Sequence, residues 1–245
     1  MTIANIWPVA NQYLYQGEDC VMILAHLVKK NLYSPSTFQD PAQRVIMDNG
    51  AFEGEQVSQN LNDLISLAEN SGLPIDEIVV PDEINNAART CELFQENLPA
   101  IKQWQNKYKF MVVAHATNFA ELSFMIDYYN QFYSRLDLVV GISKLTPLDR
   151  ADEQAIEAYK KCKFPIHFLG LKKTFKELDK VKDIIRSCDT SQLAYMAKNG
   201  WDMKESVWDF VRTEQGKDID LEHDEINSGE ARVLRIREHL RMLRK

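Results

Sequence analysis

The sequence predicts a (β/α)8 barrel, and three observations lead to this fold class. Seven short runs of apolar or β-branched residues recur along the 245-residue chain, and their near-continuous hydrophobicity is typical of strands buried on both faces of a parallel sheet. Longer segments of helical period separate these runs. One more strand near either end of the series would close a barrel of eight strands, and a doubly wound open parallel sheet is the alternative.

The expected strands follow one another along the whole chain. They span residues 21–27, 44–47, 77–80, 110–114, 136–140, 165–169 and 184–188. Three of the helices between them are expected from apolar faces, which comprise Val57, Leu61, Leu64, Ile65 and Ala68, then Ala87, Cys91, Phe94 and Leu98, then Phe119, Leu122, Ile126, Tyr129 and Tyr133. We expect Gly72 to end the first of these helices, and Thr174 with Glu177 has the spacing of a capping box that starts another.

Composition and cysteine spacing exclude several classes of protein. The longest apolar run, residues 21–28, is far shorter than the roughly 20 residues of a membrane span, and the N-terminus lacks the basic start of a signal peptide. We therefore expect a cytoplasmic protein with no membrane partner. The four cysteines lie far apart with no CxxC pair, so we expect reduced thiols, no metal site and no cofactor.

The net charge of −7 is unevenly distributed along the chain. Residues 1–213 are expected to form the barrel, and residues 214–227, with six acidic side chains and one Lys, a solvated linker. Residues 228–245 are expected to form a basic helix that packs on the barrel and exposes Arg237, Arg241 and Arg244. A second basic segment, residues 160–182, includes Lys172 and Lys173. Each basic segment is either an ordinary solvated helix face or a phosphate-binding surface.

Polar and flexible residues follow the expected strands, at the end of a barrel that carries its chemistry. In chain order these residues are Asp48, Asp82, His115, Gly141, Gly170 and Asp189. Each has an ordinary explanation when it is taken alone, because an Asp there often caps the next helix, a His is often a satisfied loop residue, and a Gly often relieves a tight turn. His167, which alternates with apolar residues inside an expected strand, is interpreted as structural.

The residues after Asp48 give this candidate site a more specific character. Asn49, Gly50 and Ala51 are small, and Phe52 then offers an aromatic face beside a carboxylate. Proteins hold flat polar rings by stacking on the ring face and by hydrogen bonds at the ring edge. This pattern therefore favours a site that binds such a ring.

The motifs at the strand ends are DNGAFE, VVPDE, VVAHA, VGIS, LGL and SCDTS, preceded by LAHL at 24–27. In this series, over residues 20 to 200, the chain resembles the catalytic barrel of the tRNA-guanine transglycosylases, and above all the short phage and bacterial relatives that insert 7-deazaguanine bases into DNA. The resemblance implies that Asp189 attacks the sugar C1′ to form a covalent intermediate and that Asp48 handles the proton of the base. It further implies base contacts by Phe52 through stacking, by Asp82 through accepted N–H groups, and by His115, Gly141 and Gly170.

The chemistry of the residues agrees with these implied roles. Cleavage of an N-glycosidic bond passes through an oxocarbenium-like state, which one carboxylate below C1′ and one proton donor on the base can stabilise. Like charges close together should raise the pKa of at least one carboxyl group, which favours Asp48 as the acid. Asp82 needs N–H donors to offset its burial, and a guanine-like edge would supply them.

The chain departs from the family pattern in three respects. It lacks the clustered cysteines and histidine of the zinc subdomain in the tRNA-acting members, which favours DNA as the partner. His115 replaces a Gln that is usual in the family, and Asn49 with Ala51 replaces smaller or hydroxylated residues. The leading hypothesis is exchange of a base in DNA, flipped or single-stranded, for a free 7-deazaguanine-type base, by a monomer or a homodimer. The alternatives are a DNA glycosylase that leaves an abasic site, as in defence against phages, and a modified-nucleotide binding module without catalysis.

Overall fold

The computed structural model describes residues 1–145, 147–171, 176–191, 194–195 and 221–223. Several sequence expectations lie outside these residues. They are the basic helix of 228–245 with Arg237, Arg241 and Arg244, the phosphate-binding candidates Lys172 and Lys173, and Thr174 of the capping box. Of the acidic stretch 214–227, residues 221–223 are described.

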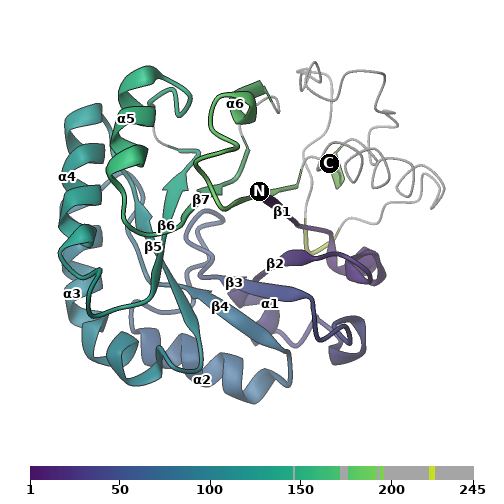
Figure 1. Ribbon diagram of the computed structural model, residues 1–245. Coiled ribbons are helices and arrows are strands. Elements are labelled where there is room, and N and C mark those ends of the chain that lie inside the picture. The colour runs from purple at the N-terminus through teal and green to yellow at the C-terminus, as the bar shows by residue number, and fades with distance from the viewer. Residues whose placement is uncertain (146, 172–175, 192–193, 196–220, 224–245) are drawn as a thin grey trace.

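Eight parallel strands form a closed barrel in the sheet order β1 to β8 (Figure 1). The strands are β1 (Thr2–Asn5), β2 (Cys20–Leu24), β3 (Arg44–Asp48), β4 (Ile75–Val79), β5 (Lys109–Ala114), β6 (Leu138–Ser143), β7 (Ile166–Leu169) and β8 (Ser187–Thr190). Helices connect most successive strands and lie outside the barrel (Figure 1). The predicted (β/α)8 barrel is therefore confirmed, and the open-sheet alternative is wrong.

The eighth strand is β1, at the amino end of the series. It pairs with β8 from Thr2 opposite Ser187 to Asn5 opposite Thr190, and it meets β2 where Asn5 lies opposite Val21. Only four residues long, β1 is too short to stand out by hydrophobicity.

The other seven strands overlap the expected ranges with shifted limits, and three of these shifts bear on the helices or on the site. The apolar run 21–27 contains the end of β2 at Leu24 and the start of helix α1 (Ala25–Lys29), because a short buried apolar run suits either structure. Strand β6 continues to Ser143, so Gly141 lies inside it rather than after it. Similarly, Asp189 lies within β8.

The remaining helices are α2 (Leu61–Ser71), α3 (Ala87–Trp104), α4 (Phe119–Asn130), α5 (Glu153–Lys161) and α6 (Lys176–Asp179), with the short 3-10 helices η1 (Val9–Tyr15) and η2 (Pro35–Thr37). Gly72 ends α2 with a φ of 69°, as predicted. Val57 and Tyr133 lie outside the helices to which they were assigned. On α3 the buried face is displaced from the predicted one and comprises Thr90, Leu93, Phe94, Asn97, Ala100 and Ile101.

Alternation along the strands divides the buried side chains into two cores. The smaller cluster contains strand residues almost alone, namely Ala4, Cys20, Met22, Ile46, Val79, Met111, Val113 and Val139, and fills the barrel. Strand neighbours such as Val21 and Ile78 belong to the larger cluster between barrel and helices. Since successive side chains point to opposite faces of a strand, Asp48, two residues after Ile46, and His115, two after Val113, are directed to the interior side.

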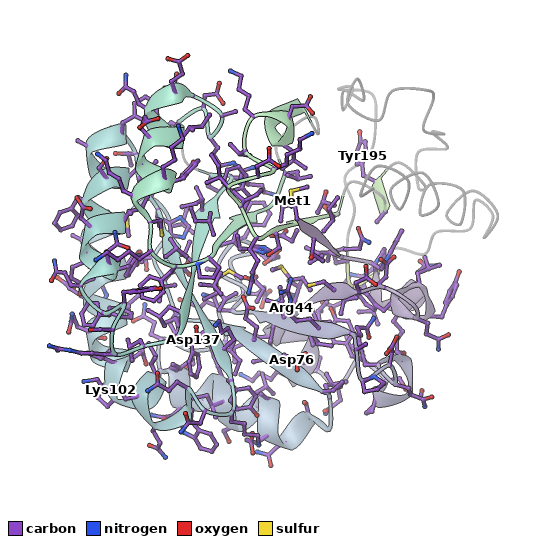
Figure 2. All side chains as sticks on the ribbon, viewed as in Figure 1. Met1, Arg44, Asp76, Lys102, Asp137 and Tyr195 are labelled. Atoms are coloured by element: carbon purple, nitrogen blue, oxygen red, sulfur yellow. The ribbon has the colours of Figure 1, made fainter. Side chains whose placement is uncertain are left out.

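The amino-terminal end of the interior is polar. Glu77 of β4 is 1% exposed and accepts two hydrogen bonds from Arg186, with N–O distances of 2.9 and 3.0 Å. Arg44, at the start of β3, donates from Nε to Cys20 Sγ at 3.3 Å (Figure 2). Side chains from several strands thus close this end of the barrel.

The described residues of the acidic stretch contact the barrel. The Leu221 carbonyl accepts a hydrogen bond from the Val9 backbone N–H at 2.8 Å, and Leu221 packs against the larger core. Glu222 pairs with Lys30 at 2.6 Å. At these residues the expected solvated linker is tied to the first helices of the chain.

Within the described part of the chain, no helix combines the length and apolar character that a membrane crossing requires.

Gly141 leaves no room for a side chain inside the barrel. A Cβ at this position would lie 2.8 Å from Leu169 Cδ1 and 3.1 Å from Met111 Sδ. We expect Gly141→Ala to lower the free energy of unfolding by about 1–3 kcal/mol, the usual cost of overpacking. Urea titration measures this change. Leu169→Ala should lower the free energy of unfolding less in the Gly141→Ala background than in the native protein. Strictly additive losses would contradict a steric cause.

Candidate active site

The predicted site residues lie at the carboxyl end of the barrel. Asp48 is the last residue of β3, and Asp82 follows β4 after two residues. His115 comes directly after β5 and Gly170 directly after β7, as predicted. Because all eight strands are parallel, these positions and Asp189 in β8 share one end of the barrel.

One oxygen of the Asp189 carboxylate is held by two donors. The Gly170 backbone N–H donates to Oδ1 at 2.8 Å, and His167 Nε2 lies 3.1 Å from the same atom. Asp189 is 5% exposed and His167 is fully buried. No described residue hydrogen-bonds the second oxygen, Oδ2. The bonds to Oδ1 therefore fix the orientation of the carboxylate and leave Oδ2 unbonded within the described part of the chain.

Asp48 is the carboxyl group with the most strongly perturbed acidity at this end. Burial raises its pKa well above the ordinary value, and the negative charges of Glu53, Asp82 and Asp189 raise the pKa further. One hydrogen bond, from the Gly50 backbone N–H at 3.2 Å, opposes the rise. The three aspartates are thus close enough to interact, and Asp48 is the one suited to keep a proton and donate it.

Both oxygens of Asp82 already have donors from the protein. Asn49 Nδ2 donates to Oδ1 at 2.8 Å, and His115 Nε2 lies 2.6 Å from Oδ2. Asp82 and His115 are each 4% exposed. Asn49 and His115 therefore supply the N–H donors that were expected from a base.

His115 keeps its second nitrogen for another partner. A carboxylate only accepts hydrogen bonds, so the imidazole proton sits on Nε2, toward Asp82. Nδ1 then carries a lone pair, and this buried atom has no hydrogen-bond partner among the described residues. An imidazole has the arrangement of a general base when one nitrogen donates to a carboxylate and the other is unprotonated and has no partner.

Phe52 lies at the rim with 51% of its surface exposed. The ammonium of Lys144 sits 4.1 Å from the centre of the Phe52 ring, and the Lys144 stem passes over Gly170. A Cβ at Gly170 would lie 2.4 Å from Lys144 Cδ, and Gly170 has a φ of 64°, a conformation that favours glycine. One face of the Phe52 ring, which was predicted to stack on a base, is therefore covered by the Lys144 ammonium.

Arg150 organises the loops beside Asp189. It is fully buried in the turn before α5 and donates to the carbonyls of Ile142, Leu169 and Gly170 at 3.1, 3.2 and 2.7 Å. Its guanidinium also lies 4.5 Å from the Phe168 ring centre. These bonds fix the carboxyl ends of β6 and β7, and with them the Gly170 N–H that holds Asp189.

Helix capping, the ordinary explanation for the strand-end aspartates, does not apply to Asp48 or Asp82. The helices that follow them are α2 and α3, which are capped by the side chains of Asn60 and Asn86. Gly141 is also not a turn residue, since it lies within β6. Among the described residues, no group of three or more His, Cys, Asp or Glu side chains is placed to hold a metal ion.

The sequence did not indicate the site roles of Lys144, Arg150 and His167, or the hydrogen bond from Asn49 to Asp82. His167 was set aside as structural because it alternates with apolar residues, although this alternation directs it to the interior beside Asp189. Lys144 and Arg150 follow β6, and a search of every strand-end loop for charged residues would have included them. The contacts of Asn49 depend on the neighbouring loop after β4.

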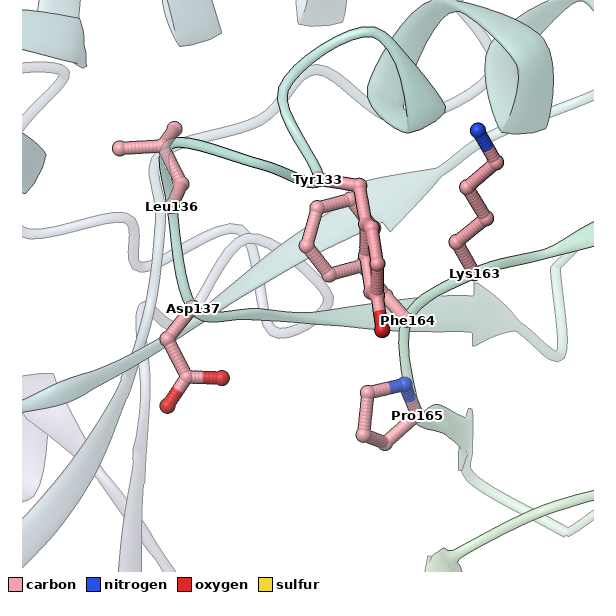
Figure 3. A pocket seen from close by; sticks show the side chains of 6 residues that line it. All are labelled: Tyr133, Leu136, Asp137, Lys163, Phe164 and Pro165. Atoms are coloured by element: carbon pink, nitrogen blue, oxygen red, sulfur yellow. The ribbon is translucent and has the colours of Figure 1, made fainter.

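A groove of about 620 Å³ lies at the opposite end of the barrel (Figure 3). It is lined by Tyr133, Leu136, Asp137, Lys163, Phe164 and Pro165, which precede β6 and β7. It is therefore separate from the aspartates at the carboxyl ends of the strands.

No family model matches this chain, and no curated protein matches it either. Solved structures similar to it include β-methylaspartase from Clostridium tetanomorphum, with 11% identity and a TM-score of 0.52 over 77% of this chain and 53% of that one. A mandelate racemase/muconate lactonizing enzyme from Roseiflexus has 11% identity and a TM-score of 0.50 over 77% of this chain and 54% of that one. This chain thus spans about half the length of both enzymes.

A glycerol uptake operon antiterminator-related protein from Thermotoga maritima is also similar, with 14% identity and a TM-score of 0.49 over 78% of this chain and 96% of that one. At 11% identity the two enzymes show the barrel fold alone. None of the three is a nucleobase transglycosylase by name.

The raised pKa of Asp48 makes the stability of the protein depend on pH. The folded state holds this proton more tightly than the unfolded chain, so the free energy of unfolding falls as pH rises from about 4, the ordinary Asp value, toward the raised pKa. We expect Asp48→Asn to match the native protein near pH 4 and to exceed it at pH 7, by about 1.4 kcal/mol for each unit of the rise. Urea unfolding at several pH values measures the difference. A difference that stays constant with pH would contradict protonation of Asp48 in the folded protein.

Proposed function

We propose that this protein cleaves the N-glycosidic bond of a nucleobase in DNA and exchanges the base for a 7-deazaguanine-type base. The observation that carries the proposal is the pairing of two different carboxyl groups at one end of the barrel. Asp189 is a fixed carboxylate with one available oxygen, and Asp48 is an acid with a raised pKa. A nucleophile and a proton donor of this kind are the two groups that a retaining glycosyl transfer requires.

The proposed reaction has two displacements at the sugar C1′. Asp189 Oδ2 attacks C1′, the bond from C1′ to the base nitrogen breaks, and its electron pair leaves with the base. Asp48 gives its proton to the departing base. The incoming base then attacks C1′ through nitrogen, Asp189 leaves, and the proton of the incoming base passes to Asp48. Both steps need the base outside the helix, because the site lies at the mouth of a barrel.

Base binding in this proposal uses the rim. Phe52 stacks on the base either through its face away from Lys144 or after the ammonium has moved aside. Asp82 contributes by holding His115, since Asn49 and His115 already donate to both of its oxygens. The choice of DNA rests on the sequence resemblance and on the missing zinc-subdomain cysteines.

Hydrolysis is the second candidate, and the bare Nδ1 of His115 favours it. In this reaction water takes the place of the incoming base and attacks C1′ of the sugar ester. His115 Nδ1 accepts the proton from water while Asp82 holds the opposite nitrogen, and Asp189 leaves as the carboxylate. The product is an abasic site. The two candidates share the first displacement and differ in what resolves the intermediate.

The first test is incubation of the protein with single-stranded and duplex DNA, with and without a labelled 7-deazaguanine base. Label in the DNA indicates exchange, and alkali-sensitive sites without added base indicate hydrolysis. We expect Asp189→Ala to lower either rate at least about 1,000-fold while DNA binding persists, because the nucleophile is lost. Asp137→Ala, which removes an exposed carboxylate from the opposite end, is the matched control and should keep full activity. Neither product with any DNA, or full activity in Asp189→Ala, would overturn the proposal.

A second test asks whether His115 activates water in hydrolysis. His115→Gln keeps an N–H donor for Asp82 but removes the basic nitrogen. If hydrolysis occurs, we expect this variant to lose on the order of 100-fold in abasic-site formation, the usual contribution of a general base, and to form the covalent DNA adduct at the native rate. Unchanged abasic-site formation would exclude His115 as the base that activates water.

A further inference from the structure

A continuous line of polar side chains runs through the barrel interior from Asp189 to the amino-terminal end. His167 Nδ1 lies 2.8 Å from Ser187 Oγ, and Arg186 Nε donates to the same oxygen at 3.1 Å. Arg186 in turn makes the two bonds to Glu77 described above. The line joins β4, β7 and β8 across the barrel.

The direction of each hydrogen bond in this line is fixed by chemistry. Arg186 can only donate, so Ser187 Oγ accepts from it and has one hydrogen left to give. That hydrogen points to His167 Nδ1, which therefore accepts. A hydrogen on Nδ1 would leave the Ser187 oxygen facing two N–H donors, with no acceptor for its own hydrogen. The imidazole hydrogen thus belongs on Nε2, where it is donated to Asp189 Oδ1.

We infer that Ser187, held by the Glu77–Arg186 ion pair, and Asp189 together fix His167 in the Nε2–H tautomer, and that His167 is a positioning residue for Asp189. His167 and the Gly170 N–H together hold Oδ1, which turns Oδ2 toward the substrate. The other tautomer would present a lone pair to the carboxylate and push it away. The inference rests on the proposed function only in treating Asp189 as the nucleophile.

The tautomer is measured directly in the full-length protein. With ¹⁵N-labelled histidine, we expect the His167 resonances to show a bare Nδ1 and a protonated Nε2, with His167→Gln identifying which of the five histidines gives them. Ser187→Ala removes the hydrogen given to Nδ1, so the Nδ1 resonance should shift toward that of a nitrogen that accepts no hydrogen bond, while Nε2 stays protonated toward Asp189. A protonated Nδ1 in the native protein, or an unchanged Nδ1 resonance in Ser187→Ala, would overturn the inference. These outcomes do not depend on any substrate.

The effect on Asp189 is measured by trapping the covalent DNA adduct. We expect His167→Leu to slow adduct formation about 100-fold, the order of loss that follows a misplaced reacting group, with DNA affinity unchanged. His167→Gln offers both an N–H donor for Asp189 and an oxygen for the Ser187 hydrogen, so it should recover most of the rate. Equal losses in both variants would overturn the positioning role. Absence of any adduct in the native protein would instead refute the proposed function and leave the tautomer assignment standing.

Discussion

Pairing between β1 and β8 closes the barrel, and the geometry of the site depends on this seam. Asp189 lies on β8 opposite Ala4 of β1, so without the closing pair it would stand on a free sheet edge. On its other side, β8 pairs with β7, whose residues include His167 and which is followed by Gly170. Because the barrel is closed, Asp189 has a neighbouring strand on both sides. His167 of β7 and the Gly170 N–H that follows this strand are the two donors that orient its carboxylate.

The three aspartates differ in how many hydrogen bonds the protein gives them. Asp189 receives the Gly170 N–H and His167, and Asp82 receives Asn49 and His115. Asp48 receives one backbone N–H at 3.2 Å and faces the charges of the others. Hydrogen bonds to a carboxylate stabilise its ionised form. Burial, the charge of Glu53 and this unequal bonding together favour Asp48 as the group that keeps a proton. The proposed two-step transfer at a sugar carbon needs this division of roles.

Most of the fold and half of the site could be predicted from the sequence, for physical reasons that particular residues illustrate. Buried parallel strands leave apolar runs, and Asp48, Asp82 and His115 follow such runs closely enough to be recognised. β1 is too short to give that signal. His167 could not be assigned because its partners lie on β8, and the cover of Phe52 by Lys144 depends on two loops that meet only in the folded barrel.

In most proteins of this architecture the two ends of the barrel change independently, since one end carries chemistry and the other supports stability. Here the Glu77–Arg186 pair at the amino-terminal end is joined by hydrogen bonds to the side chain beside Asp189. The modularity that lets such barrels be re-engineered from one face is therefore reduced in this chain. Given the inferred positioning role of His167, a redesign that replaced this ion pair with apolar packing to gain thermal stability would also disturb the orientation of Asp189 at the far end.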